Sequence, residues 1–202
     1  MSLGPRRRLL LGAAALLAWP LFARAGPQAE EALADAVRSA LTAAVASAAP
    51  PKPRFGRLED RLDFLRWLGA MSERLKRIKS EAATRIEFLE TLWYESKRAG
   101  LEPALVLALI QVESGFRKYA ISAAGARGYM QVMPFWTRQI GDGDPARLFH
   151  MQTNLRFGCV ILRHYLDLER GDLFLALGRY NGSRGRVEYP NAVMANRQHW
   201  MN

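Results

Sequence analysis

The sequence predicts an all-α protein in which β-structure is at most a rudimentary hairpin. Residues 104–112 are almost entirely apolar, which is typical of a helix buried on every side. Other stretches repeat apolar residues every three or four positions, the period of an amphipathic helix. Up to residue 100, no stretch shows the apolar–polar alternation of a half-buried strand. These observations favour a helical catalytic or binding domain with a helical extension before it.

The first 25 residues have the organisation of a secretory signal peptide. Three arginines at positions 6–8 precede fourteen apolar-region residues at positions 9–22, and Ala-Arg-Ala at positions 23–25 forms an A-x-A cleavage site. The apolar region is short for a membrane span, so cleavage is expected rather than an uncleaved anchor. No cysteine lies at the cleavage site, so a lipid anchor on an N-terminal cysteine is not expected. The mature chain is expected to be periplasmic or exported, without stable membrane insertion.

The charge of the mature chain is moderately positive. The formal net charge of the whole sequence is +10, and residues 1–25 carry four arginines and no acids, so the remainder carries +10 − 4 = +6. These cations do not cluster on one helix, and no DNA-binding module is recognisable, so nucleic acid is not an expected partner. A modest positive excess suits an anionic extracytoplasmic polymer. The one cysteine, Cys159, lies within an apolar helical pattern and is expected to be a small buried hydrophobe.

Two helical segments are expected before the main domain. Residues 26–56 form an alanine-rich arm with one thin apolar stripe, followed by a proline-rich linker at positions 50–53, and this pattern predicts a weakly docked or mobile segment. Residues 57–83 predict an amphipathic helix that packs on the domain. Its expected inward face consists of Leu58, Leu62, Leu65, Leu68, Met71, Leu75 and Ile78.

Residues 84–202 are expected to form the main domain. Gly100 ends a first helix over 84–99, and Pro103 begins the apolar helix, because proline is tolerated at the first helical position. Gly115 is a plausible C-cap of that helix. The glycine-rich residues 116–128 predict a loop, followed by a short helix over 129–140 that is interrupted at Pro134. A turn at 141–145 and helices over 153–168, 173–180 and 189–200 complete the domain.

Glu113 is the strongest candidate for a catalytic group. It lies near the C-terminal end of the most apolar helix, beside a glycine-rich loop. Burial disfavours its charged form, and so does the negative end of the helix dipole. Both effects raise its pKa towards the range that a general acid needs near neutral pH.

Four motifs around Glu113 resemble those of the soluble lytic transglycosylases. They are Glu-Ser-Gly-Phe at 113–116 with Ser122, Gly-Ala-Arg-Gly-Tyr-Met-Gln-Val-Met-Pro at 125–134, Asn-Leu-Arg-Phe-Gly at 154–158, and Arg-Tyr-Asn-Gly at 179–182. The resemblance covers residues 101–189. It implies a lysozyme-like fold and cleavage of peptidoglycan between N-acetylmuramic acid and N-acetylglucosamine with a 1,6-anhydro product. No cofactor or metal is implied.

The resemblance also implies roles for individual residues. Ser122 would place the acetamido group of the sugar, although it could equally be a serine that only forms a turn. Gln131 and Met133 would line the floor of the cleft, and Met133 could also be part of the core. Tyr180 would point its hydroxyl at Glu113 and orient it, and Asn181 would begin the loop that closes the site. The family more often has alanine at the position of Arg179 and leucine at that of Tyr129.

The residues themselves suggest a mechanism with one carboxylate. Between Glu113 and Asp142 there is no aspartate or glutamate, whereas ordinary glycosidases place two carboxylates around the scissile bond. One carboxyl group suffices if it first protonates the glycosidic oxygen and then removes the proton of the sugar's own C6 hydroxyl. Asp142 or Asp144 could still fold back towards the cleft.

Two other functions compete with this interpretation. A hydrolase similar to goose-type lysozyme would require a second carboxylate near Glu113. A non-catalytic peptidoglycan-binding protein could keep the fold without the chemistry, but its sequence would be expected to lose Glu113 or Tyr180. A partner in a cell-wall or secretion machine is compatible with all three.

Overall fold

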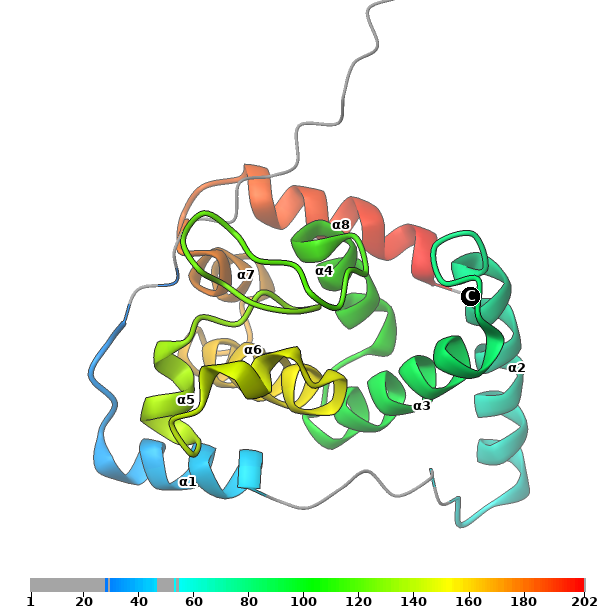
Figure 1. The fold of residues 1–202 in the computed structure, drawn as a ribbon, viewed down its shortest axis with the longest axis horizontal. Helices are drawn as coiled ribbons and strands as arrows, with labels where there is room; N and C mark the ends of the chain where they lie inside the picture. Colours follow the sequence, from blue (N-terminus) through cyan, green and yellow to red (C-terminus); the bar gives the residue numbers. More distant parts are fainter. Residues whose placement is uncertain (1–27, 29, 47–52, 54, 202) are drawn as a thin grey trace, which may run out of the picture.

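The computed structural model describes residues 28, 30–46, 53 and 55–201 of the 202-residue chain. The proposed signal peptide lies outside the described residues, as does most of the proline-rich linker. The described part contains eight α-helices and one 3₁₀ helix, which confirms the predicted all-α class (Figure 1). In chain order they are α1 (Asp35–Ala46), α2 (Leu58–Leu75), α3 (Ala82–Arg98), α4 (Pro103–Ser114), α5 (Phe135–Ile140), η1 (Pro145–Phe149), α6 (Met151–Leu168), α7 (Leu173–Asn181) and α8 (Glu188–Trp200).

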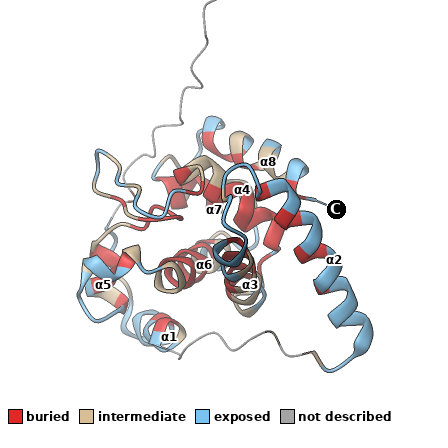
Figure 2. Cartoon of the chain, turned by 45° about the vertical axis from the view of Figure 1, so that its right-hand side comes forward, coloured by how far each residue is buried: buried red, intermediate tan, exposed pale blue. Residues whose placement is uncertain are grey.

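Helix α4 is the centre of the fold, as its apolar sequence predicts. Every residue from Pro103 to Ile110 is buried, and Figure 2 shows this helix in red inside the other elements. Pro103 occupies its first turn, and Gly115 caps its end in the left-handed conformation with φ 55°. Helices α3 and α8 pack on α4, and α6 packs on both α3 and α7. Residues 111–113 near the carboxyl end of α4 are only partly buried.

The loop region after α4 contains the small amount of β-structure that was predicted. Two isolated bridges, between residues 121 and 127 and between 127 and 132, are the β-pairings of the described residues. The expected helix over 129–140 is wrong in its first half, because residues 129–134 form turns and one β-bridge, and α5 begins only after Pro134. None of the helices in the described ranges is long and apolar enough to cross a membrane.

Helix α2 confirms the predicted inward face only in its second half, where Leu68, Met71 and Leu75 are buried. Leu58, Leu62 and Leu65 are exposed, and so is Ile78 beyond the helix. In the first half of the helix, Phe64 and Trp67 are buried in place of these leucines. Rings decide the orientation at the first half of the helix, because Phe64 lies 5.1 Å from Phe55 and 5.2 Å from Trp93. Aromatic side chains contribute more buried area than leucines, so the helix turns its aromatic stripe inward.

Helix α1 is docked on the domain, whereas how strongly the arm is held stays a prediction. Leu41 and Val45 are buried, and the helix packs on α5 and α6. Arginines from the domain cap its last carbonyl groups: Arg98 donates to the carbonyl of Ala44, and Arg156 donates to that of Val45 at 3.4 Å. Leu41 and Val45 of the predicted stripe face the domain, whereas Val37 is exposed.

A buried ion pair joins α3 to α6 beneath α1. Glu95 is 1% exposed and accepts hydrogen bonds from Nε and Nη2 of Arg156 at 3.1 and 2.9 Å. Its other oxygen accepts from Arg98 at 3.1 Å. Removing one member of a buried pair leaves the other charge without compensation.

We expect Glu95→Ala to lower the free energy of unfolding by about 3–5 kcal/mol, because Arg156 would remain buried and charged. Urea unfolding followed by circular dichroism measures this change. Glu59→Ala is the matched control, since Glu59 is 68% exposed in its ion pair with Arg57 and should cost less than about 1 kcal/mol. Equal losses in the two variants would contradict the role of the buried pair.

Candidate active site

Glu113 lies in the last turn of α4, where the sequence places it. Its side chain is partly buried, and loss of hydration raises the pKa of its carboxyl group from 4.5 to about 8. Near neutral pH this group is therefore protonated in the free protein. It combines two properties of a general acid, a pKa near the working pH and residual access to a ligand.

The hydroxyl group that contacts Glu113 belongs to Tyr189, which was not predicted. Tyr189 is in the first turn of α8, and its Oη donates to Oε1 of Glu113 at 2.5 Å. This hydrogen bond favours the carboxylate and opposes part of the pKa increase caused by burial. Burial also raises the pKa of Tyr189 itself, so the phenol keeps its proton and remains a donor. Tyr189 thus orients Glu113 and stabilises its charged form.

Tyr180 has a different role from the predicted one. It is fully buried at the end of α7, and its hydroxyl donates to the carbonyl of Met130 at 2.7 Å. The prediction that this hydroxyl orients Glu113 is therefore corrected. Tyr180 remains close enough for the charge of Glu113 to raise its pKa, but the bond it makes fastens α7 to the loop over the site.

The loop after α4 is held in place by buried polar side chains. Ser114 Oγ donates to the carbonyl of Tyr129 at 2.7 Å. Asn154, on α6, accepts from the N–H of Met130 at 2.8 Å and donates to the carbonyl of Arg127 at 2.8 Å. A Cβ at Gly128 would lie 2.4 Å from Asn154 Nδ2, so only glycine allows this approach. Asn154, the first residue of the motif at 154–158, therefore supports the loop.

Gln131 and Ser122 are both engaged within the loop. Gln131 is buried, has a left-handed backbone with φ 48°, and donates its side-chain amide to the carbonyls of Ala120 and Gly128 at 3.2 and 3.0 Å. Ser122 Oγ accepts from the N–H of Ala126 at 3.1 Å, which is the turn-forming alternative. A non-glycine residue with positive φ persists only where its surroundings enforce it, and such residues cluster at functional sites.

Met133 lies just before α5, and Asn181 is the last residue of α7. Met133 is partly buried and packs against the core. Asn181 is 4% exposed at the end of α7, and its Nδ2 atom is buried without a hydrogen-bond partner among the described residues. A buried amide without a partner is costly, so this atom is suited to a ligand acceptor.

The two aspartates that could have entered the site are held elsewhere. Asp142 pairs with Arg147 and accepts from the N–H of Asp144 at 3.2 Å. Asp144 caps η1 by accepting from the N–H of Ala146 at 2.8 Å. Both line a cavity of about 480 Å³ between α1, α5 and α6, to which Glu113 does not contribute. Within the described ranges, no three His, Cys, Asp or Glu residues form a group that could hold a metal ion.

Sequence reasoning missed Tyr189 because it lies outside the four motifs, seven positions after the last of them. Tyr189, Val193 and Trp200 are buried on one side of α8, and their spacing of four and seven is a helical signal for a buried face. The contact with Glu113 depends on the packing of α8 along α4, which spacing alone does not show.

Comparison with known proteins identifies a family domain that includes Glu113. The family described as Transglycosylase SLT domain matches residues 91–200, which is more than half of the chain. Membrane-bound lytic murein transglycosylase C of Actinobacillus pleuropneumoniae serotype 5b (strain L20) is 37% identical over 84 residues, 38% of this chain and 23% of that protein. The transglycosylase of Enterobacteria phage PRD1 is 30% identical over 118 residues, 55% of this chain and 43% of that protein.

A solved structure is also similar, an inactive mutant of the lytic transglycosylase Slt from Pseudomonas aeruginosa. It has a TM-score of 0.45 and 24% identity over 70% of this chain and 27% of that one. The chain spans less than half the length of each of these three proteins. Because the family match covers α4, the loop, α6, α7 and α8 together, the chain belongs to the family defined by the transglycosylase SLT domain.

Proposed function

We propose that this protein is a peptidoglycan lytic transglycosylase, a carbon–oxygen lyase that acts in the cell envelope after export. It would cleave the β-1,4 bond between N-acetylmuramic acid and N-acetylglucosamine. Family membership supports the reaction class, and the names of the two matched relatives agree with it. The proposed single-carboxylate mechanism is supported by the protonation and surroundings of Glu113.

The observation that carries the proposal is the isolation of Glu113 from other carboxylates. The pKa of Glu113 is raised to about 8 by burial and opposed by the Tyr189 hydrogen bond, with no contribution from a second acid among the described residues. A carboxylate at the distance used by ordinary glycosidases would raise this pKa further through charge repulsion. Asp142 and Asp144 are occupied at the α5–η1 turn. This supports a mechanism in which one carboxyl group serves both steps.

Over the two steps, the bonds and protons balance without the consumption of a water molecule. Protonated Glu113 donates its proton to the glycosidic oxygen as the bond from that oxygen to C1 breaks, and N-acetylglucosamine leaves with a free hydroxyl group. The Glu113 carboxylate then removes the proton from the C6 hydroxyl of N-acetylmuramic acid as its oxygen bonds to C1. The product is the 1,6-anhydro sugar, and Glu113 is protonated again. The attack is intramolecular, so the nucleophile acts at a high effective concentration.

The substrate contacts that we propose come from Met133 and Asn181. The free Nδ2 of Asn181 would donate to a sugar or acetamido oxygen. Ser122 and Gln131 would shape the loop, because their side chains already bind backbone groups within it. Ser122 Oγ accepts a bond there and can still donate its own proton to an acetamido oxygen. Tyr180 would support the site from beneath the loop.

Digestion of purified peptidoglycan in water labelled with oxygen-18, followed by mass spectrometry, tests the proposal. We expect anhydro-muropeptides that are one water lighter than hydrolysis products and carry no label. Lysozyme in the same labelled water provides the hydrolytic reference. Labelled reducing ends from this protein would show a hydrolase, and Asp142 would then be the next residue to substitute. Binding to peptidoglycan without any product would indicate the non-catalytic alternative.

A further inference from the structure

A stretch of uncompensated positive charge follows Glu113 in the chain. Residues 114–141 contain four arginines or lysines and no aspartate or glutamate. The charge of Lys118 also acts on Lys79, whose pKa is lowered first by burial and second by this repulsion. An excess of positive charge raises the local concentration of anions, so an anionic ligand is expected at this surface.

Two neighbouring aromatic rings each have one of these cations beside them. The ring centres of Tyr119 and Phe149 are 6.0 Å apart. Nζ of Lys118 lies 5.2 Å from the centre of the Tyr119 ring, and the guanidinium carbon of Arg127 lies 5.5 Å from that of Phe149. We call these four residues the loop patch. Tyr119 is 70% exposed, the highest value among the large apolar side chains of the described residues, so the patch is open to a ligand.

The backbone beneath the loop patch is held by hydrogen bonds. Ala120 follows Tyr119, and its carbonyl accepts from the side-chain amide of Gln131 at 3.2 Å. Arg127 exchanges two backbone hydrogen bonds with Val132, at 2.9 and 3.0 Å. The backbone positions of Tyr119 and Arg127 are therefore fixed before any ligand binds. Such preorganisation reduces the entropy that binding costs.

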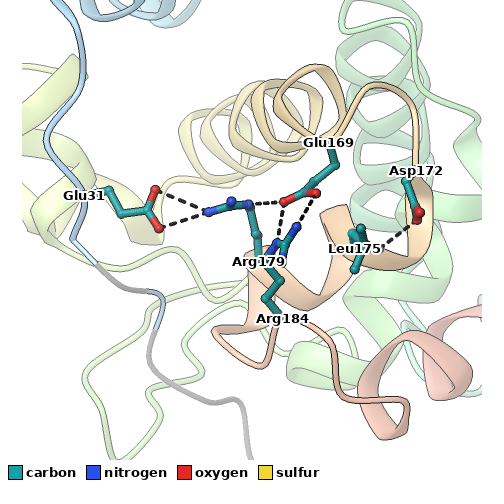
Figure 3. A network of polar contacts seen from close by, with 6 residues as sticks. All are labelled: Glu31, Glu169, Asp172, Leu175, Arg179 and Arg184. Atoms are coloured by element: carbon teal, nitrogen blue, oxygen red, sulfur yellow. Dashed lines mark hydrogen bonds and ion pairs between the residues drawn. The ribbon is translucent and has the colours of Figure 1, made fainter.

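By contrast, the cations at the end of α7 and in the loop after it are paired with carboxylates. Glu169 accepts from Arg184 at 2.7 and 2.9 Å and also pairs with Arg179. Arg179 lies 3.1 Å from Glu31 as well (Figure 3). Hydrogen bonds from Arg184 and Arg179 lower the pKa of Glu169 to about 2, so this carboxylate stays charged. The two cations of the loop patch have no such carboxylate partner among the described residues.

We propose that the loop patch binds the acidic stem peptides of peptidoglycan. This inference rests on the proposed function, and it adds a contact with the substrate outside the sugar chain. Stem peptides carry free carboxylates, which would pair with Lys118 and Arg127. Their methyl and methylene groups would pack on the rings of Tyr119 and Phe149. Arg127 uses Nη1 to donate to the carbonyl of Pro145 at 2.9 Å and keeps further N–H donors for a carboxylate.

A neutral ligand would leave the charge of the loop patch uncompensated. Sugar rings could pack on Tyr119, but only an anion also pairs with the cations beside the two rings. The patch should therefore raise the affinity of the protein for intact peptidoglycan above its affinity for bare glycan.

Sedimentation with purified insoluble peptidoglycan measures this binding in the Glu113→Gln background, in which the polymer is expected to stay intact. Lys118→Ala with Tyr119→Ala removes one cation and the most exposed ring of the loop patch. Lys76→Ala with Ile78→Ala is the matched control, because it removes an exposed cation and an exposed apolar side chain just after α2. Neutral β-1,4-linked N-acetylglucosamine oligomers, measured by calorimetry, provide a sugar chain without stem peptides.

The patch variant should bind peptidoglycan about five- to tenfold more weakly than the parent, because an exposed ion pair and a packed ring each contribute modestly. This loss should shrink at high salt, which screens exposed charges. The control should bind like the parent, and the oligomers should bind all three proteins equally. Unchanged peptidoglycan binding by the patch variant, with native circular dichroism, would overturn the proposal. An equal loss for the neutral oligomers would also overturn it, because the patch would then bind sugars.

Peptidoglycan stripped of its stem peptides by an amidase tests the ligand directly. It should bind the parent more weakly than intact peptidoglycan does, and it should bind the parent and the patch variant equally. A patch variant that still binds the stripped polymer more weakly than the parent would overturn the assignment to stem peptides.

Vesicles that contain phosphatidylglycerol test an anionic lipid surface as the partner instead. Loss of vesicle binding in the patch variant, with unchanged binding to peptidoglycan, would overturn the proposal in favour of a membrane. If the unmodified protein releases no anhydro product, the proposed function fails. Weaker binding of the patch variant to intact peptidoglycan alone would still support the loop patch in that case.

Discussion

Replacing Glu113 with glutamine is expected to abolish detectable cleavage of peptidoglycan while the protein stays folded. Positioned proton transfer is worth on the order of 10²–10⁴ in rate, and here the same group would serve both as acid and as base. The glutamine keeps the shape of the side chain and an oxygen that can accept from Tyr189. Glycan binding should therefore persist.

Clearing of a peptidoglycan suspension, together with mass spectrometry of the supernatant, measures this loss. Glu59→Gln is the control, since Glu59 is an exposed residue of α2. Cleavage by the Glu113→Gln variant at a rate near that of the unmodified protein would exclude Glu113 as the acid.

The same variant should be more stable than the unmodified protein at neutral pH. The folded pKa of Glu113, about 8, is above the ordinary value of 4.5, so between these two pH values the folded state binds more protons than the unfolded state. The free energy of unfolding therefore falls as pH rises through this range. In the glutamine variant this decrease in the free energy of unfolding is absent. The decrease is up to about 3 kcal/mol at pH 7 and close to zero at pH 4. Urea unfolding at the two pH values measures the difference.

The sequence allowed the central helix and its acid to be predicted because local signals mark both ends of the helix. Pro103 and Gly115 bound α4 within the chain itself, and an apolar run between them can only be buried. The buried face of the first half of α2 could not be predicted in this way. Its leucines and its aromatic residues both recur at helical spacing, and the choice between the two faces was made by Phe55 and Trp93, which lie outside the helix.

The candidate site shows the same difference between contacts that are local in the sequence and contacts between distant elements. Glu113 was located by its position on one helix, and the hydrogen bonds of Ser122 and Gln131 are local to the loop. The partner of Glu113 depends on how α8 lies along α4. The sequence alone therefore could not show whether Tyr180 or Tyr189, nine positions apart, donates the hydrogen bond to Glu113. Similarly, the contacts of Gln28 span 108 residues of sequence, and no periodicity in the arm indicates them.

Replacing Tyr189 with phenylalanine should lower kcat by about 10- to 100-fold, because a hydrogen bond to a charged group is worth about 1.5–3 kcal/mol. In the first step Glu113 gains negative charge, and the Tyr189 hydroxyl is the donor that stabilises it. Loss of this hydrogen bond also changes the dependence of kcat/KM on pH. This bond lowers the pKa of Glu113, so its removal should raise that pKa. The alkaline limb of kcat/KM, expected near pH 8, should move to higher pH.

Tyr180→Phe is the matched control, since it removes a buried hydroxyl of the same kind beside the same site. It should cost about 1–3 kcal/mol of stability, because the carbonyl of Met130 loses its buried donor. It should leave the alkaline limb in place, because its hydroxyl does not donate to Glu113. Measuring kcat/KM across pH for both variants distinguishes the two tyrosines. A shifted limb in Tyr180→Phe with an unchanged one in Tyr189→Phe would restore the role that the sequence motif implied for Tyr180.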